Sequence, residues 1–166
     1  MIRKRTKAFS ALFVTLAATV LLSMSMSVAY ATTPISVSGT FNVTGGTVQS
    51  WSVSGESDNG ILISTVSGVY AGDIAGAYIS DYHAVVHNRG TPEMWRNIHT
   101  VATISATVLG EKTGTLYVMI NGKYGEDGTW VIIGGTDDLA GLHGQGTYHP
   151  VTTTLVNYEG QIHFDP

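Results

Sequence analysis

Six histidines in a chain of 166 residues are the first side chains that could bind a metal ion. His83 and His87 share one face of a predicted strand with Asp81, because side chains alternate between the two faces of a strand. The two histidines then stand about 13 Å apart at the rise of a strand, too far for one zinc ion with bonds near 2 Å. His99 and His163 fall on predicted polar faces. We therefore predict no metal site and no cofactor.

Neither carboxylate pairs nor nucleophile motifs predict a catalytic centre. Asp137–Asp138 and Glu126–Asp127 are adjacent pairs in turn sequences, where acidic residues are favoured for solvation and hydrogen bonds to the backbone. The chain has no cysteine, G-x-S-x-G elbow, H-E-x-x-H, phosphate-binding loop or dinucleotide fingerprint. We assign no catalytic residue, and we expect a binding protein rather than an enzyme.

Aromatic and polar side chains on candidate central strands, and in one loop, could instead contact a small molecule. If they face the inside of a barrel or its mouth they would line a ligand pocket, but they could equally fill a narrow barrel. Both faces of these strands are apolar, so the sequence leaves the two alternatives open. The candidate ligand-binding residues are Tyr78, Asp81, Tyr82, Trp95, Arg96, Tyr117 and Trp130.

These side chains must be positioned by strands, because the chain after residue 31 alternates apolar and polar residues and has no sustained helical period. Turn sequences separate the alternating segments, among them Gly45-Gly46, Arg89–Pro92 and Gly125–Gly128. About eight short strands result, which is typical of an all-β sandwich or closed barrel. The predicted strands are 35–44, 61–70, 75–87, 98–108, 112–124, 129–133, 141–149 and 156–164.

The first 31 residues predict a secretory signal peptide. Four cations stand within the first seven residues, an apolar run follows, and Ala29-Tyr30-Ala31 is a small-x-small cleavage pattern. We expect cleavage after Ala31, a single domain over residues 32–166, and a secreted, periplasmic or extracellular product. After cleavage we expect no stable membrane insertion.

Cleavage would leave an acidic protein. Four of the eight Lys and Arg residues, and none of the twelve Asp and Glu residues, lie in the first 31 positions. The remainder carries a formal charge of −8, the balance of four cations and twelve anions. Because nucleic-acid binding requires clustered cations, we expect no nucleic-acid partner.

A glycine-rich segment, Gly134–Gly146, resembles the G-S/T-G-x-L-x-G-L-x-G-x-G stretch of an uncharacterised bacterial domain family related to allene oxide cyclase and the dirigent proteins. Three further segments resemble strands of that family in the expected order: Ser67–Gly76, Gly114–Met119 and Gly128–Ile132. The resemblance spans about Phe41 to Phe164. It departs from the pattern at Asp137, which stands where the family has its third glycine.

The resemblance implies an eight-stranded antiparallel β-barrel, like allene oxide cyclase and lipocalin-like in outline. The plant relatives are often dimers or trimers, so a homo-oligomer is also expected. The fold carries over but the cyclase activity does not, since fold likeness is a weak basis for function. The leading hypothesis is a secreted barrel that binds a small apolar or aromatic molecule. The alternatives are a cofactor-free cyclase or isomerase acting inside the barrel, and a self-associating structural module of the cell envelope.

Overall fold

The computed structural model describes residues 32–53 and 59–165, and the predictions made for residues 1–31 lie outside them. Thr32–Asp165 form one compact unit. Its elements are β1 (Ile35–Val53), β2 (Gly60–Gly72), β3 (Ile74–His87), β4 (Trp95–Val108), β5 (Lys112–Lys123), β6 (Gly128–Gly135), the 3₁₀ turn η1 (Asp137–Leu139), β7 (Leu142–Pro150) and β8 (Leu155–Phe164). Over these two stretches no helix has the length and apolar character needed to cross a membrane.

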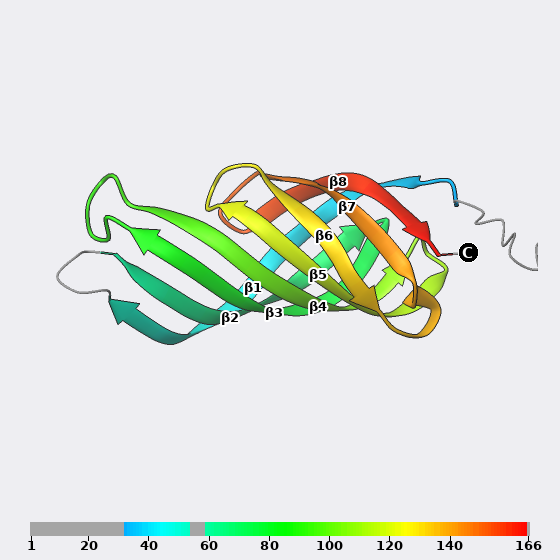
Figure 1. Ribbon diagram of the computed structural model, residues 1–166, viewed down its shortest axis with the longest axis horizontal. Helices are drawn as coiled ribbons and strands as arrows, with labels where there is room; N and C mark the ends of the chain where they lie inside the picture. The colour runs from blue at the N-terminus through cyan, green and yellow to red at the C-terminus, as the bar shows by residue number, and fades with distance from the viewer. Residues whose placement is uncertain (1–31, 54–58, 166) are drawn as a thin grey trace, which may run out of the picture. The chain divides into compact units, whose positions relative to one another are not determined.

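The eight strands close into one hydrogen-bonded ring (Figure 1). Each strand pairs antiparallel with the next, and β8 returns to β1 by pairing Leu155–Ile162 with Ile35–Asn42. The predicted all-β, eight-stranded antiparallel fold is confirmed. The ring is barrel-like but not evenly round one axis.

Strong stagger between the strands explains this uneven shape. The stagger is measured by following directly paired residues from each strand to the next around the ring. Starting at Trp51 in β1, this path passes Ile98 in β4 and Tyr148 in β7 and reaches β1 again at Gly39. The return point lies twelve positions before Trp51. Such a shift tilts the strands relative to the barrel axis, so their ends do not finish level.

The first strand is much longer than predicted. Gly45-Gly46 was predicted to be a turn, and this is wrong, because β1 continues through both glycines to Val53 beside β2. A register shift between Val43 and Gly45 absorbs the irregularity as a bulge, a place where glycine is common. Only the part of β1 up to Asn42 pairs with β8.

Residues 45–53 and the strands beside them therefore extend past β5–β8, on the left of Figure 1. We call this part the overhang. It comprises Gly45–Val53 of β1, Gly60–Ser67 of β2, Tyr82–His87 of β3 and Trp95–Thr100 of β4, of which residues 97–100 also pair with the end of β5. The end of the barrel that carries it is the open end, and the other is the closed end.

The closed end is sealed by aliphatic side chains and by η1. Leu139 of η1 is fully buried and packs against Gly114 and Gly135, whose missing side chains make room for it. Asp137, at the position where the resembled family has glycine, has a φ of 54°, in the left-handed region that Asp tolerates better than most residues. Asp137 therefore replaces the glycine of the family pattern but keeps the left-handed backbone conformation that glycine commonly adopts.

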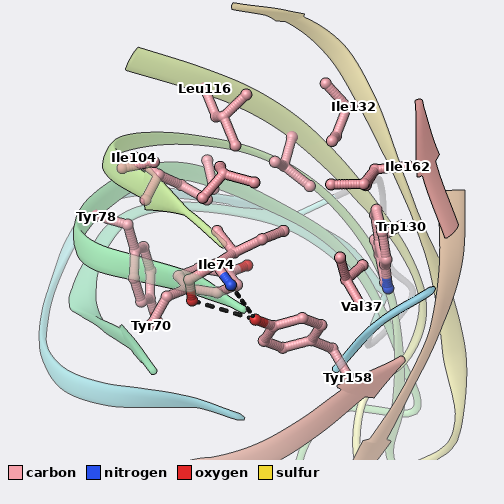
Figure 2. Packing of buried hydrophobic residues seen from close by; sticks show 14 of the residues in the cluster. Val37, Tyr70, Ile74, Tyr78, Ile104, Leu116, Trp130, Ile132, Tyr158 and Ile162 are labelled. Atoms are coloured by element: carbon pink, nitrogen blue, oxygen red, sulfur yellow. Dashed lines mark hydrogen bonds between the residues drawn. The ribbon is translucent and has the colours of Figure 1, made fainter. Parts of the chain in front are cut away.

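Aromatic side chains fill the middle of the barrel. Phe41 packs on Tyr70 with ring centroids 5.1 Å apart, and Tyr70 packs on Tyr78 at 5.3 Å. Figure 2 shows Tyr70, Tyr78, Trp130 and Tyr158 directed into this core with the aliphatic residues of the closed end around them. The interior therefore consists of an aliphatic layer, an aromatic layer and then the open end.

Candidate functional site

The interior of the closed ring leaves no room for an organic ligand. Its cavity measures about 10 Å³ and is walled by aromatic and aliphatic side chains, including Phe41, Tyr70, Trp130 and Tyr158. About 10–15 Å³ is needed to hold a single water molecule. Of the two alternatives left open by the sequence, the narrow barrel filled by its own side chains is the one found.

Trp130 and Tyr78, two of the candidate ligand-binding residues, are part of this filling. The Trp130 indole donates hydrogen bonds to the carbonyl oxygens of Thr147 and Glu159, at 3.1 and 3.2 Å, and is 5% exposed. Burial raises the pKa of Tyr78 to about 12. The Trp130 N–H is bonded within the fold, and both rings are packed in the core.

Asp81, Trp95 and Tyr117 lie on the outer face of the barrel. Asp81 and Tyr117 are exposed, each between residues that point inward. Trp95 stacks on its cross-strand neighbour His87, with ring centroids 3.8 Å apart. The structure does not bring these three candidates together with the inner-face residues.

Tyr82 and Arg96 are the two candidates that face inward at the overhang. Tyr82 is half-buried, and burial raises its pKa while the neighbouring Arg96 cation opposes that shift. The Arg96 guanidinium lies 4.8 Å from the centre of the Tyr124 ring, a cation–π contact that holds it in place. The two residues belong to neighbouring strands, β3 and β4.

Two further inner-face residues, Trp51 and Tyr148, were not predicted. The Trp51 ring covers Gly60 on the overhang, and the Arg89 guanidinium lies 4.4 Å from its centre. The Tyr148 hydroxyl lies over Gly122, on β5. Trp51 was missed because the Gly-Gly turn prediction ended the first strand too early, and Tyr148 because the inward face of its strand could not be identified.

Buried polar atoms without a hydrogen-bond partner gather in this region. Within residues 32–53 and 59–165 they are Trp51 Nε1, Tyr82 Oη and Tyr148 Oη, and all three belong to inward-facing side chains toward the open end. Leaving such a group unpaired costs about 1–3 kcal/mol. Unpaired buried polar groups therefore mark a position where a ligand or ordered water completes the structure.

Apolar side chains beside these atoms are open to solvent. Val48 and Val53 on the inner face of β1 are 64% and 54% exposed. Beneath the Trp51 region, Ala84 and Val86 are buried but do not belong to the main core cluster. The inner face of the overhang is thus a second apolar surface, only partly covered by the described residues.

The histidines lie on the outside and make local pairs. His149 contacts Asp127 at 2.5 Å, and His143 contacts Asp165 at 3.0 Å. Across the described ranges, no three His, Cys, Asp or Glu side chains are grouped so that they could hold a metal ion.

The chain belongs to a family described as "Protein of unknown function (DUF3224)", whose family model matches residues 37–160. A similar solved structure is the crystal structure of a protein with unknown function from the DUF3224 family of Shewanella oneidensis MR-1. It is 13% identical, with a TM-score of 0.65, and the match covers 81% of this chain and 99% of that one. At this identity the likeness supports the fold alone. No curated protein matches the chain.

Proposed function

We propose that this member of the family is an exported, non-catalytic binding protein for a small apolar or aromatic molecule. The ligand binds on the inner face of the overhang rather than inside the closed ring. The expected signal peptide supports export.

The observation that carries the proposal is the set of unpartnered polar atoms beside exposed apolar surface. Ligand sites combine apolar lining with a few polar groups that fix orientation. Trp51, Tyr82 and Tyr148 supply the polar groups, and Val48 and Val53 supply the apolar surface. The filled interior directs the proposal to this end of the barrel.

The alternative of a cyclase or isomerase acting inside the barrel receives no support from the geometry. The cavity of about 10 Å³ could not contain a substrate, and of its two candidate polar groups, Tyr82 and Asp81, Asp81 lies on the outer face. We propose that this protein shares the eight-stranded fold of allene oxide cyclase and the dirigent proteins, and we do not propose that it shares their activities.

Native mass spectrometry tests the binding function. The full-length gene is expressed in its own host and the exported product is measured before and after denaturation. We expect a reproducible excess mass that denaturation removes, together with a polypeptide that begins at Thr32. A bare polypeptide that also fails to bind small apolar and aromatic compounds would overturn the proposal.

The outer face favours a second proposal, self-association. Ile79, Tyr117 and Ile133, on three strands of the outer wall, are 55%, 38% and 53% exposed, and Val101 and Met119 beside them are half-buried. Such a patch, uncharged at its centre, is typical of a protein interface. Light scattering should show an oligomer that Ile79→Asp dissociates and that Val151→Asp, a change to an exposed loop residue, leaves intact. A monomeric wild-type protein would overturn this proposal.

A further inference from the structure

We infer that the ligand carries an anionic oxygen group, such as a carboxylate, on its apolar or aromatic body, and that Arg96 binds this group. The inference rests on the proposed function and specifies the chemical class of its ligand. Three features of the open end support it.

Arg96 makes no ion pair with a carboxylate among the described residues. Its guanidinium is instead held against the Tyr124 ring, 4.8 Å from the ring centre. A guanidinium presents parallel N–H donors that match the two oxygens of a carboxylate. Stacking on an aromatic ring fixes this group in advance, so less entropy is lost when an anion binds.

The unpartnered atoms toward the open end can all donate hydrogen bonds. Trp51 Nε1 can only donate, and the hydroxyls of Tyr82 and Tyr148 can donate or accept. An inner face with one unpaired cation and several unused donors requires acceptor atoms from its ligand. Oxygen anions supply such acceptors, whereas an ammonium group could not pair with the Trp51 N–H and would be repelled by Arg96.

The inner face of the overhang carries no acidic residue on its four strand segments, and Asp81, which pairs with Thr65, lies on the outer face. Of the acidic residues described at the open end outside these segments, Glu126 and Asp127 are paired, whereas Glu93, in the loop between β3 and β4, is exposed and makes no ion pair with a described residue. Glu126 contacts Lys123 at 2.5 Å, and Asp127 contacts His149 at 2.5 Å. The strands of the overhang thus present no negative charge to repel an anion.

Cations are concentrated at the same end. After residue 31 the sequence contains only four Lys and Arg residues. Arg89, Arg96 and Lys123 lie at the open end, whereas Lys112 lies at the closed end against the Phe164 ring. Because Glu93, Glu126 and Asp127 lie at this end as well, Arg96 on the inner face, and not the charge of the whole end, is the group that would attract an anion.

Matched pairs of ligands test the inference by isothermal titration calorimetry. The probes are 2-naphthoate with its neutral amide, and octanoate with its neutral amide. We expect the wild-type protein to bind at least one carboxylate about tenfold or more tighter than the corresponding amide, the size of effect given by a charge-assisted hydrogen bond.

Three variants test whether Arg96 causes the preference for the carboxylate over the amide. Arg96→Gln should abolish it, and Arg96→Lys should retain part of it, because Lys keeps the charge but not the paired donors. Lys112→Gln, which makes the same change in net charge at the closed end, should retain the full preference. Thermal unfolding of each variant establishes that it is folded.

The possible results distinguish a failure of the anionic-ligand inference from a failure of the proposed binding function. Equal binding of acids and amides by the wild-type protein would overturn the anionic class while supporting the binding function. A preference for the acid that survives Arg96→Gln in folded protein would overturn the role of Arg96. Failure of all four compounds to bind would count against both.

Discussion

Tyr148 and Tyr158 are directly paired across β7 and β8, yet only one of their two hydroxyls makes hydrogen bonds within the fold. The Tyr158 hydroxyl accepts a hydrogen bond from the Ile74 N–H at 2.8 Å and donates one to the Ile74 carbonyl at 3.1 Å (Figure 2). The Tyr148 hydroxyl is buried without a partner toward the open end. One tyrosine hydroxyl of the pair is bonded within the fold, and the other has no hydrogen-bond partner among the described residues.

Removing these two hydroxyls should therefore have different effects on stability. Tyr158→Phe leaves the Ile74 N–H and carbonyl unpaired, so we expect a loss of about 1–3 kcal/mol in the free energy of unfolding. Tyr148→Phe removes an unpartnered group of nearly the same shape, so stability should stay the same or rise. Urea denaturation at neutral pH measures both. Equal losses for the two variants would contradict the assignment.

Gly146 should not tolerate a side chain. A Cβ added there would lie 2.0 Å from the Glu159 carbonyl oxygen and 2.6 Å from the Trp130 indole. We expect Gly146→Ala to cost about 2 kcal/mol or more, because backbone on one side and a packed ring on the other prevent relaxation. Gly134→Ala is the matched control, since its Cβ would meet only Tyr117 at 3.6 Å. A Gly146→Ala protein as stable as the control would show that Trp130 is not packed as described.

Alkaline pH should destabilise the fold. Burial raises the pKa of Tyr78 and of Tyr158 to about 12, and it also raises the pKa of Tyr70. The folded state thus holds these protons more tightly than the unfolded chain, where tyrosine titrates near 10. The stabilisation is fully present below about pH 10 and is lost as the pH rises from about 10 to about 12, at up to about 1.4 kcal/mol per pH unit for each tyrosine.

Urea denaturation at several pH values above 9, with tyrosinate absorbance followed in parallel, checks this dependence. Tyrosinate formation in the folded protein should lag behind that in urea. Stability that remained constant between pH 9 and 11 would contradict the burial of these phenols.

Much of the fold could be predicted from the sequence, because alternation and turn chemistry are local signals. The hairpin closed at Gly125–Gly128 is one example that the structure confirms. The overhang could not be predicted, because Gly45-Gly46 reads as a turn in isolation. Whether two glycines form a turn or a bulge depends on a neighbouring strand, here β2, that lies far along the chain.

The candidate site was harder to predict for a related reason. Tyr78, Tyr82 and Tyr117 stand on strands with apolar residues on both faces, so periodicity could not say which rings point inward. Closure of the ring decides this, since it places Tyr78 and Tyr82 inside and Tyr117 outside. The interior that remains is smaller than any organic ligand, a property of packing that no local pattern encodes.

Methyl NMR during titration with 2-naphthoate or octanoate tests most directly whether the overhang, and not the interior, binds the ligand. Val48, Val53 and Leu62 report on the inner face of the overhang, whereas Leu116 and Ile132 report on the closed core. We predict concentration-dependent shifts of the first set and unchanged signals for the second. Shifts confined to Leu116 and Ile132 would show that the ligand enters the barrel and would contradict the account.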